Sequence, residues 1–238
     1  VELLSSQDVQ NRSNAVRPDG LRGGIWSASE ACVDPRQAIA ELPNFLAHEY
    51  GVELCFSTPV QALDLPNIYT PSTTWRAERA VVCSGVDFES LYPSIYQSSG
   101  LTRCKLQMMR TVPQPDSWQL GPMLAAGLTL RHYAAFKQCT SLASYTERVS
   151  RENPEFDQWG IHVMASQNGL GEITIGDSHE YDWHPDPFDK PALDQLVMAY
   201  LQTFLTAPTL HIAQRWSGRY VKHPTDADFV AAPAPGVR

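Results

Sequence analysis

The spacing of apolar residues predicts a helix near the start of the chain. Apolar side chains recur at helical intervals through Ala38, Ile39, Leu42 and Leu46. Asp34 can cap the start of this helix, and Pro35 suits its first position, where a missing N–H costs nothing. Gly51 is expected to end it, because glycine readily adopts the left-handed conformation found after helix ends.

Strand patterns follow this helix. Val52–Phe56 alternates apolar and polar residues, as a half-buried strand does. Ala80–Cys83 is a continuous apolar run that stops at Ser84-Gly85, which is typical of a strand covered on both faces in a parallel sheet. Leu101–Val112 predicts a long strand, and Pro113 closes it.

The second half of the chain is richer in strands. Gly127–Arg131 is expected to be a strand, and Ile161–Met164 and Ile173–Ile175 are expected to form a hairpin across Asn168-Gly169. The clearest amphipathic helix runs from Leu193 to Leu205. The pattern thus predicts an α/β portion over residues 1–100 and an α+β portion over residues 101–238.

Composition excludes several classes of partner. The formal net charge is −8, with 26 acidic and 18 basic residues and no run of Lys or Arg, which argues against a nucleic-acid or anionic membrane surface. No apolar stretch approaches the roughly 18–20 residues that a membrane span needs. Five cysteines without a C-x-x-C pair suit reduced thiols in a cytoplasmic protein better than disulfides or a zinc knuckle. The oligomeric state is not indicated.

Several motifs carry a resemblance to a known family. They are Gly24-Ile25-Trp26 through Val33-Asp34-Pro35-Arg36, Ala80–Gly85, Arg215–Gly218, Gly127–Tyr133, Ile161–Gly169 and Gly176–Glu180. In this order the chain resembles the central part of an FAD-dependent oxidoreductase of the glycine oxidase/D-amino-acid oxidase superfamily. The last three motifs resemble a bacterial branch associated with aminophosphonate catabolism. The resemblance covers essentially the whole chain.

The resemblance implies a fold and a cofactor. Residues 1–100 would form an incomplete Rossmann-like FAD-binding domain. Residues 101–238 would form a substrate domain on a mixed, largely antiparallel sheet, with the last strands returning toward the FAD domain. The family's G-x-G-x-x-G turn is not in these 238 residues, since Gly169-Leu170-Gly171 joins two strands. We therefore expect the FAD site to be incomplete and the chain by itself to be inactive.

The resemblance also assigns cofactor contacts. Val60 matches a position whose backbone meets the adenine of FAD, although its side chain would suit an ordinary core. Cys83, Ser84 and Gly85 match the strand end that meets the ADP half, where glycine lets backbone approach a ligand closely. The alternative is a strand that ends in an ordinary turn. Lys105 matches an Arg in relatives, but a solvated strand lysine is an equal interpretation.

The resemblance also assigns contacts to the substrate, which would be a small amine or amino acid. His162 matches a Tyr that faces the substrate in relatives, and Arg131 and His132 are expected to line the same cavity. The alternative for His162 is a structural role, because a lone histidine on a strand more often forms a structural hydrogen bond. Tyr220 occupies the position of the Arg that clamps a substrate carboxylate, so that clamp is lost, and Lys222 could supply charge instead. Because the flavin performs the hydride transfer, no protein residue is assigned as catalytic.

Two other functions stay open. Asp177, His179, Glu180 and His184 gather in the sequence, but they lack the spacing of a zinc motif, so a metallohydrolase is remote and no metal site is predicted. A flavin-free binding or interaction module derived from this fold is the second alternative.

Overall fold

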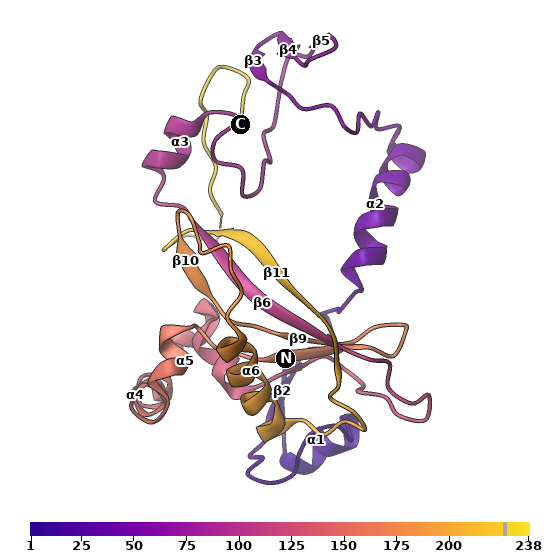
Figure 1. Ribbon diagram of the computed structural model, residues 1–238, viewed down its shortest axis with the longest axis vertical. Coiled ribbons are helices and arrows are strands. Elements are labelled where there is room, and N and C mark those ends of the chain that lie inside the picture. The colour runs from indigo at the N-terminus through magenta and orange to yellow at the C-terminus, as the bar shows by residue number, and fades with distance from the viewer. Residues whose placement is uncertain (226–227) are drawn as a thin grey trace. The chain divides into compact units, whose positions relative to one another are not determined.

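The computed structural model describes residues 1–225 and 228–238, which form two compact units (Figure 1). The first unit contains Val1–Pro35, Lys105–Glu180 and Asp186–Gly218. The second unit contains Arg36–Cys104, Tyr181–Pro185 and the described part of Arg219–Arg238. The chain therefore passes between the units several times.

The first unit holds most of the regular structure. Its elements are β1 (Glu2–Leu4), α1 (Ser6–Arg12), β2 (Gly24–Trp26), β6 (Thr102–Thr111), β7 (Leu124–Ala125), the 3₁₀ turns η1 (Gly127–Arg131) and η2 (Ala134–Gln138), α4 (Ser141–Glu152), α5 (Pro154–Gln158), β8 (Met164–Gln167), β9 (Ile173–Gly176), β10 (Glu180–Asp182), α6 (Pro191–Phe204) and β11 (Ile212–Lys222). Three of these strands, β6, β10 and β11, run on into the second unit.

A six-stranded sheet is the main structure of this unit. The strand order is β10-β6-β9-β8-β7, and β11 also pairs with β6. The β8–β9 hairpin is antiparallel, with Ala165 opposite Ile175, and Asn168 closes its turn by accepting a hydrogen bond from the Leu170 N–H at 2.9 Å. The predicted hairpin across Asn168-Gly169 and the long strand β6 are therefore confirmed. The expected strand Ile161–Met164 is wrong in its bounds, because β8 overlaps it only at Met164.

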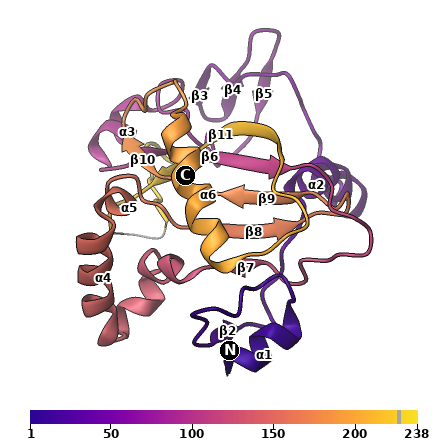
Figure 2. The ribbon, with the colours of Figure 1, turned by 60° about the horizontal axis from the view of Figure 1, so that its bottom comes forward.

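Helix α6 covers one face of this sheet (Figure 2). Its apolar stripe places Val197 and Leu201 in a buried cluster with Ile173 and Ile175 of β9. These side chains are removed from water, and burial of each large aliphatic group contributes about 1.5–3 kcal/mol. The amphipathic pattern of residues 193–205 thus predicts both the helix and the face that it buries.

A buried lysine fixes the approach to α6. Lys105 on β6 is 0% exposed, and its ammonium donates a hydrogen bond of 2.9 Å to the Asp186 carbonyl and another to the Phe188 carbonyl. Its Nζ also lies 3.0 Å from a carboxylate oxygen of Asp189. Lys105 is thus a structural cation, and the interpretation of a solvated strand residue is wrong.

The second unit is smaller and more open. It contains α2 (Pro35–Tyr50, from Arg36 onward), the antiparallel meander of β3 (Ala62–Asp64), β4 (Asn67–Tyr69) and β5 (Thr74–Arg76), and α3 (Pro93–Ser98). Arg103 is buried here, with its guanidinium 4.3 Å from the Phe88 ring centre and paired with Glu89 at 2.7 Å. Helix α2 ends as predicted, because Gly51 adopts a φ of +65°.

Two predicted strands of this unit are wrong or reduced. Val52–Phe56 has no strand structure, and no strand among residues 1–225 and 228–238 pairs with it, so its backbone has no ladder to join. Among the described residues, Ala80–Cys83 makes one isolated parallel bridge, from Ala80 to Val237, and Val81 is 74% exposed. An apolar run alone does not make a strand, because a strand also needs a partner that continues its ladder of backbone hydrogen bonds.

The expected strand at Gly127–Arg131 is also wrong. This segment forms the 3₁₀ turn η1, in which the Thr129 N–H donates to the Ala126 carbonyl at 2.9 Å. The Leu128 N–H donates to the hydroxyl of Tyr200 at 3.1 Å. Bonds from α6 and from the turn thus replace the ladder that a strand would need.

Two broader expectations concern the chain as a whole. No helix within the described ranges is long and apolar enough to cross a membrane. The division into family domains at residues 1–100 and 101–238 stays a prediction.

The buried ammonium of Lys105 generates a stability prediction. We expect Lys105→Met to lower the free energy of unfolding by about 2–4 kcal/mol, because it leaves the carbonyls of Asp186 and Phe188 without their shared donor and Asp189 without its ion pair. The exposed Lys137 gives the matched control, and Lys137→Met should change stability by no more than about 0.5 kcal/mol. Urea unfolding followed by tryptophan fluorescence measures both. Equal stability of the two variants would show that Lys105 is not a structural cation.

Candidate functional site

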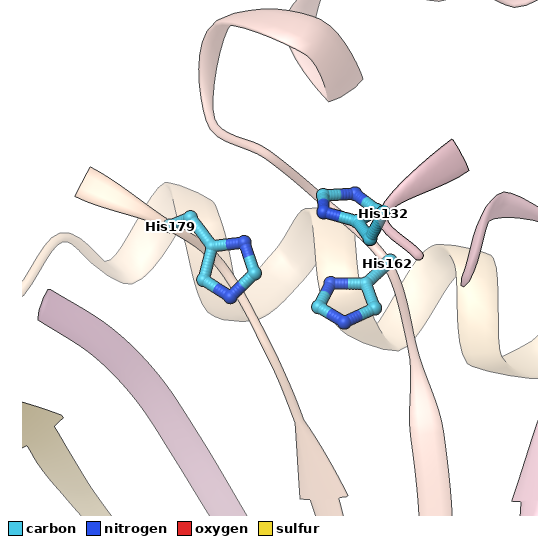
Figure 3. A group of neighbouring side chains, drawn as sticks. All are labelled: His132, His162 and His179. Atoms are coloured by element: carbon cyan, nitrogen blue, oxygen red, sulfur yellow. The ribbon is translucent and has the colours of Figure 1, made fainter. Parts of the chain in front are cut away.

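Three histidines of the first unit lie against one another (Figure 3). His132 follows η1, His162 precedes β8, and His179 follows β9. The rings of His132 and His162 are stacked with centroids 4.0 Å apart, and the His179 ring lies 4.8 Å from that of His162. One ring nitrogen from each residue lies within 4.8 Å of the other two. We call these three residues the histidine cluster.

Backbone hydrogen bonds beyond the hairpin bring two of these histidines together. The Asp177 N–H donates to the His162 carbonyl at 2.8 Å, and the His179 N–H donates to the Trp159 carbonyl at 2.7 Å. The ladder of β8 and β9 therefore continues past the ends of both strands. Gly160 permits the close approach, because a Cβ there would lie 2.7 Å from the Cβ of His179.

Asp177 gives the cluster a buried carboxyl group. Its Oδ1 lies 3.1 Å from Nδ1 of His162 and 3.7 Å from Nε2 of His179. The first contact lacks the alignment of a hydrogen bond, and neither Oδ1 of Asp177 nor Nδ1 of His162 has a hydrogen-bond partner among the described residues. Two buried polar atoms with unused bonding capacity are uncommon in folded proteins.

Burial controls the protonation of these groups. It lowers the pKa of His162 to about 3, and the neighbouring His132 and His179 act in the same direction. Burial raises the pKa of Asp177 to about 7. Near neutral pH the His162 ring is therefore uncharged and offers a lone pair on one nitrogen.

Arg131 stands beside the cluster but is already paired. Its guanidinium forms an ion pair with Asp157 of α5, and its side chain is mostly buried. Burial acts to raise the pKa of Asp157, but hydrogen bonds from Ser150 and Arg131 outweigh it and hold that pKa below its usual value. The positive charge of Arg131 is thus largely compensated within the protein.

The other predicted substrate residues belong to the second unit. Tyr220 lies on β11, and burial together with contacts to Cys104 and Tyr181 raises the pKa of its phenol. Lys222 is exposed at the end of the same strand. The structure thus brings Arg131, His132 and His162 together, and it places Tyr220 and Lys222 on a different unit.

The predicted cofactor residues Cys83, Ser84 and Gly85 line a cavity of about 400 Å³ within the second unit. Gly85 adopts a φ of +59°, and nothing lies within 4 Å of the position its Cβ would take, so a ligand could approach the backbone there. The Ser84 hydroxyl lies 2.9 Å from that of Tyr96, which holds the turn. Val60 is half-buried and is not among the described residues that line the cavity.

His179 was not linked to His162 or His132 by the sequence. It was grouped with Asp177, Glu180 and His184, but Glu180 forms an ion pair with Lys190, and exposed His184 lies in the second unit. The hairpin register was the available signal, because counting back from Asn168-Gly169 places His162 beside the 177–179 segment. The resemblance places His132 in the same cavity as His162, but no spacing pattern does.

Comparison with known families gives one match over the whole chain. The model of the FAD-dependent oxidoreductase family (DAO) matches residues 1–238. The chain belongs to this family of FAD-dependent oxidoreductases. A comparison with curated proteins gives no match.

Solved structures share the fold of this family member. An L-proline dehydrogenase from P. horikoshii superimposes with a TM-score of 0.71 at 15% identity, over 99% of this chain and 57% of that chain. A glycine oxidase from Geobacillus kaustophilus gives 0.66 at 13% identity, over 99% and 55%, and one from Bacillus cereus ATCC 14579 gives 0.59 at 12%, over 93% and 53%. The chain thus spans a little over half the length of these proteins. The predicted fold class of mixed α/β structure with antiparallel sheets is confirmed.

The tight packing at Gly160 generates a second prediction. We expect Gly160→Ala to lower the free energy of unfolding by about 1–3 kcal/mol, because alanine resists the left-handed backbone and its Cβ would press on His179. Gly169, with open space around it, is the matched control, and Gly169→Ala should cost no more than about 0.5 kcal/mol. Thermal unfolding measures the stability, and NMR of the histidine ring protons should show shifts only in Gly160→Ala. Unchanged ring signals in both variants would contradict the close contact.

Proposed function

We propose that this chain is part of an FAD-dependent enzyme that oxidises the C–N bond of a small amine or amino acid. The main support for this proposal is the family match across all 238 residues. The fold likeness to an L-proline dehydrogenase and to glycine oxidases, proteins named for amino-acid substrates, favours the same class of reaction. In such enzymes bound FAD accepts a hydride from the carbon that carries the nitrogen, and the protein positions the substrate.

The cavity of the second unit supports a role in holding FAD. Its wall includes the strand end at Cys83–Gly85, where the backbone is accessible, and exposed apolar side chains such as Val230. About 400 Å³ suits part of an FAD molecule, such as its adenosine, rather than the whole cofactor. We propose that Cys83, Ser84 and Gly85 contact the ADP half, and that the backbone of Val60 contacts the adenine.

The substrate class is proposed to be a small aminophosphonate. Tyr220 takes the position of the family's carboxylate-clamping Arg, and a phenol cannot offer two parallel N–H donors. Lys222 is exposed on the same strand and is a point charge, which suits a phosphonate with its three acceptor oxygens. Arg131 is compensated by Asp157 and His162 is uncharged, so we base this proposal on Tyr220 and Lys222, while Arg131, His132 and His162 stay predictions as substrate contacts.

A charge placed in the cavity tests the cofactor site. We expect the chain alone to bind FAD weakly, because the 238 residues lack the glycine-rich turn that cradles a pyrophosphate. At FAD concentrations high enough to measure this binding, Val230→Glu should weaken it by about tenfold through repulsion of the anionic cofactor. Val33 is exposed outside the cavity, so Val33→Glu is the matched control. Flavin fluorescence titration measures both, and equal affinities would exclude this cavity as the site.

A substrate panel tests the reaction. In the flavin-loaded enzyme of which this chain is part, stopped-flow flavin reduction should favour a small aminophosphonate over glycine, sarcosine and D-alanine by at least about tenfold in rate over affinity. The reason is that a carboxylate without its clamp is desolvated without a partner. Tyr220→Arg should restore the clamp and shift the preference toward carboxylates, whereas Tyr69→Arg on β4 should not. A wild-type preference for D-alanine or sarcosine would sink the aminophosphonate proposal and favour an ordinary amino-acid oxidase.

A further inference from the structure

The histidine cluster has the composition of a metal site rather than of an anion site. Three imidazoles and one carboxylate come together in the first unit, and His162, His179 and Asp177 are each more than nine-tenths buried. The guanidinium of Arg131, which precedes His132 in the chain, is held by Asp157. The cluster therefore offers nitrogen and oxygen lone pairs without an available positive charge.

The spacing of the donor atoms is compatible with coordination. Nitrogen ligands of a tetrahedral zinc ion lie about 2.0–2.1 Å from the metal, so neighbouring donors are about 3.3–3.4 Å apart. The Asp177 oxygen already lies 3.1 Å and 3.7 Å from nitrogens of His162 and His179. The nitrogens of the three rings lie within 4.8 Å of one another. The His132 ring, which stacks on that of His162, would have to turn to direct its lone pair at a shared ion.

We propose that His132, His162 and His179 bind a divalent transition-metal ion of the zinc class, with Asp177 as the carboxylate that orients the imidazoles and compensates the charge of the ion. Figure 3 shows the three rings facing one another from three separate segments. A carboxylate behind ligating histidines is a common arrangement, because it fixes ring orientation and raises ligand basicity.

Two buried atoms gain partners from this assignment. Nδ1 of His162 and Oδ1 of Asp177 have no hydrogen-bond partner among the described residues, and leaving such atoms unsatisfied costs about 1–3 kcal/mol each. With an ion on the far side of the His162 ring, the Nδ1–H of His162 would donate to Oδ1 of Asp177, so both atoms would gain a partner.

The donor set decides which ions fit. Imidazole nitrogens suit zinc, cobalt, nickel and copper, whereas magnesium and calcium require oxygen ligands. Binding would tie the end of η1 to the two segments that flank the β8–β9 hairpin. This proposal involves no flavin step, so it stands or falls independently of the proposed oxidoreductase activity.

Metal binding tests the proposal. The full 238-residue chain is expressed without a polyhistidine tag and is first stripped of metal with a chelator. We expect one equivalent of Co²⁺ to bind with the intense visible bands of tetrahedral cobalt, and Zn²⁺ to displace it. Zn²⁺ should raise the unfolding temperature, whereas Mg²⁺ and Ca²⁺ should not. His132→Gln, at the least buried of the three positions, should weaken Co²⁺ binding by at least about 100-fold. His211, the exposed residue just before β11, gives the matched control, and His211→Gln should bind Co²⁺ as tightly as the wild type does.

Several outcomes would overturn the proposal. One is the absence of stoichiometric cobalt or zinc binding by the wild-type chain, and another is an equal loss in His132→Gln and His211→Gln. Should His132→Gln fail to fold, X-ray absorption of the zinc-loaded wild type decides the matter. That spectrum should show three imidazole nitrogens, and fewer than three would exclude the histidine cluster as the site.

Discussion

The first unit depends on the burial of one positive charge at Lys105. An ammonium removed from water is costly unless it is fully paired, so the 186–189 loop must turn its carbonyls toward β6. Two residues along the same strand, Gln107 accepts a hydrogen bond from the Lys190 N–H at 2.7 Å and donates one to Asp194 at 2.9 Å. Together these contacts fix where α6 begins, and hence which of its faces covers the sheet.

Sequence patterns predicted those elements whose partners are close in the chain. The hairpin across Asn168-Gly169 and helix α6 follow from local turn chemistry and periodicity, and both are present. Val52–Phe56 failed because a strand pattern requires a neighbouring strand, and none pairs with it among the described residues. Lys105 was ambiguous because periodicity shows that a residue faces inward or outward, but not whether carbonyls from a distant loop will meet its charge.

In the candidate site, too, local contacts could be predicted from the sequence and long-range contacts could not. The meeting of His162 with Asp177 is a consequence of hairpin register, so it was accessible from the sequence. His132 reaches the other two histidines only because Gly127–Arg131 forms a 3₁₀ turn instead of a strand. That choice depends on tertiary bonds, including the one from Leu128 to the Tyr200 hydroxyl, which no local pattern reports. Three histidines distant in sequence therefore form a cluster that motif spacing could not reveal.

The charges of the histidine cluster also decide which of two ligands it suits, a phosphonate dianion or a metal ion. To bind a phosphonate dianion strongly, the cluster would need cationic donors, yet its described members are three imidazoles and the carboxyl group of Asp177. The nearby Asp177 carboxyl would repel the same dianion whenever it is ionised, and Arg131 is already compensated by Asp157. Each of these features disfavours an anion and favours a cation. Recognition of an anionic substrate group therefore falls to residues elsewhere, of which Lys222 is the exposed cation on the strand of Tyr220, and the histidines are left for a metal ion.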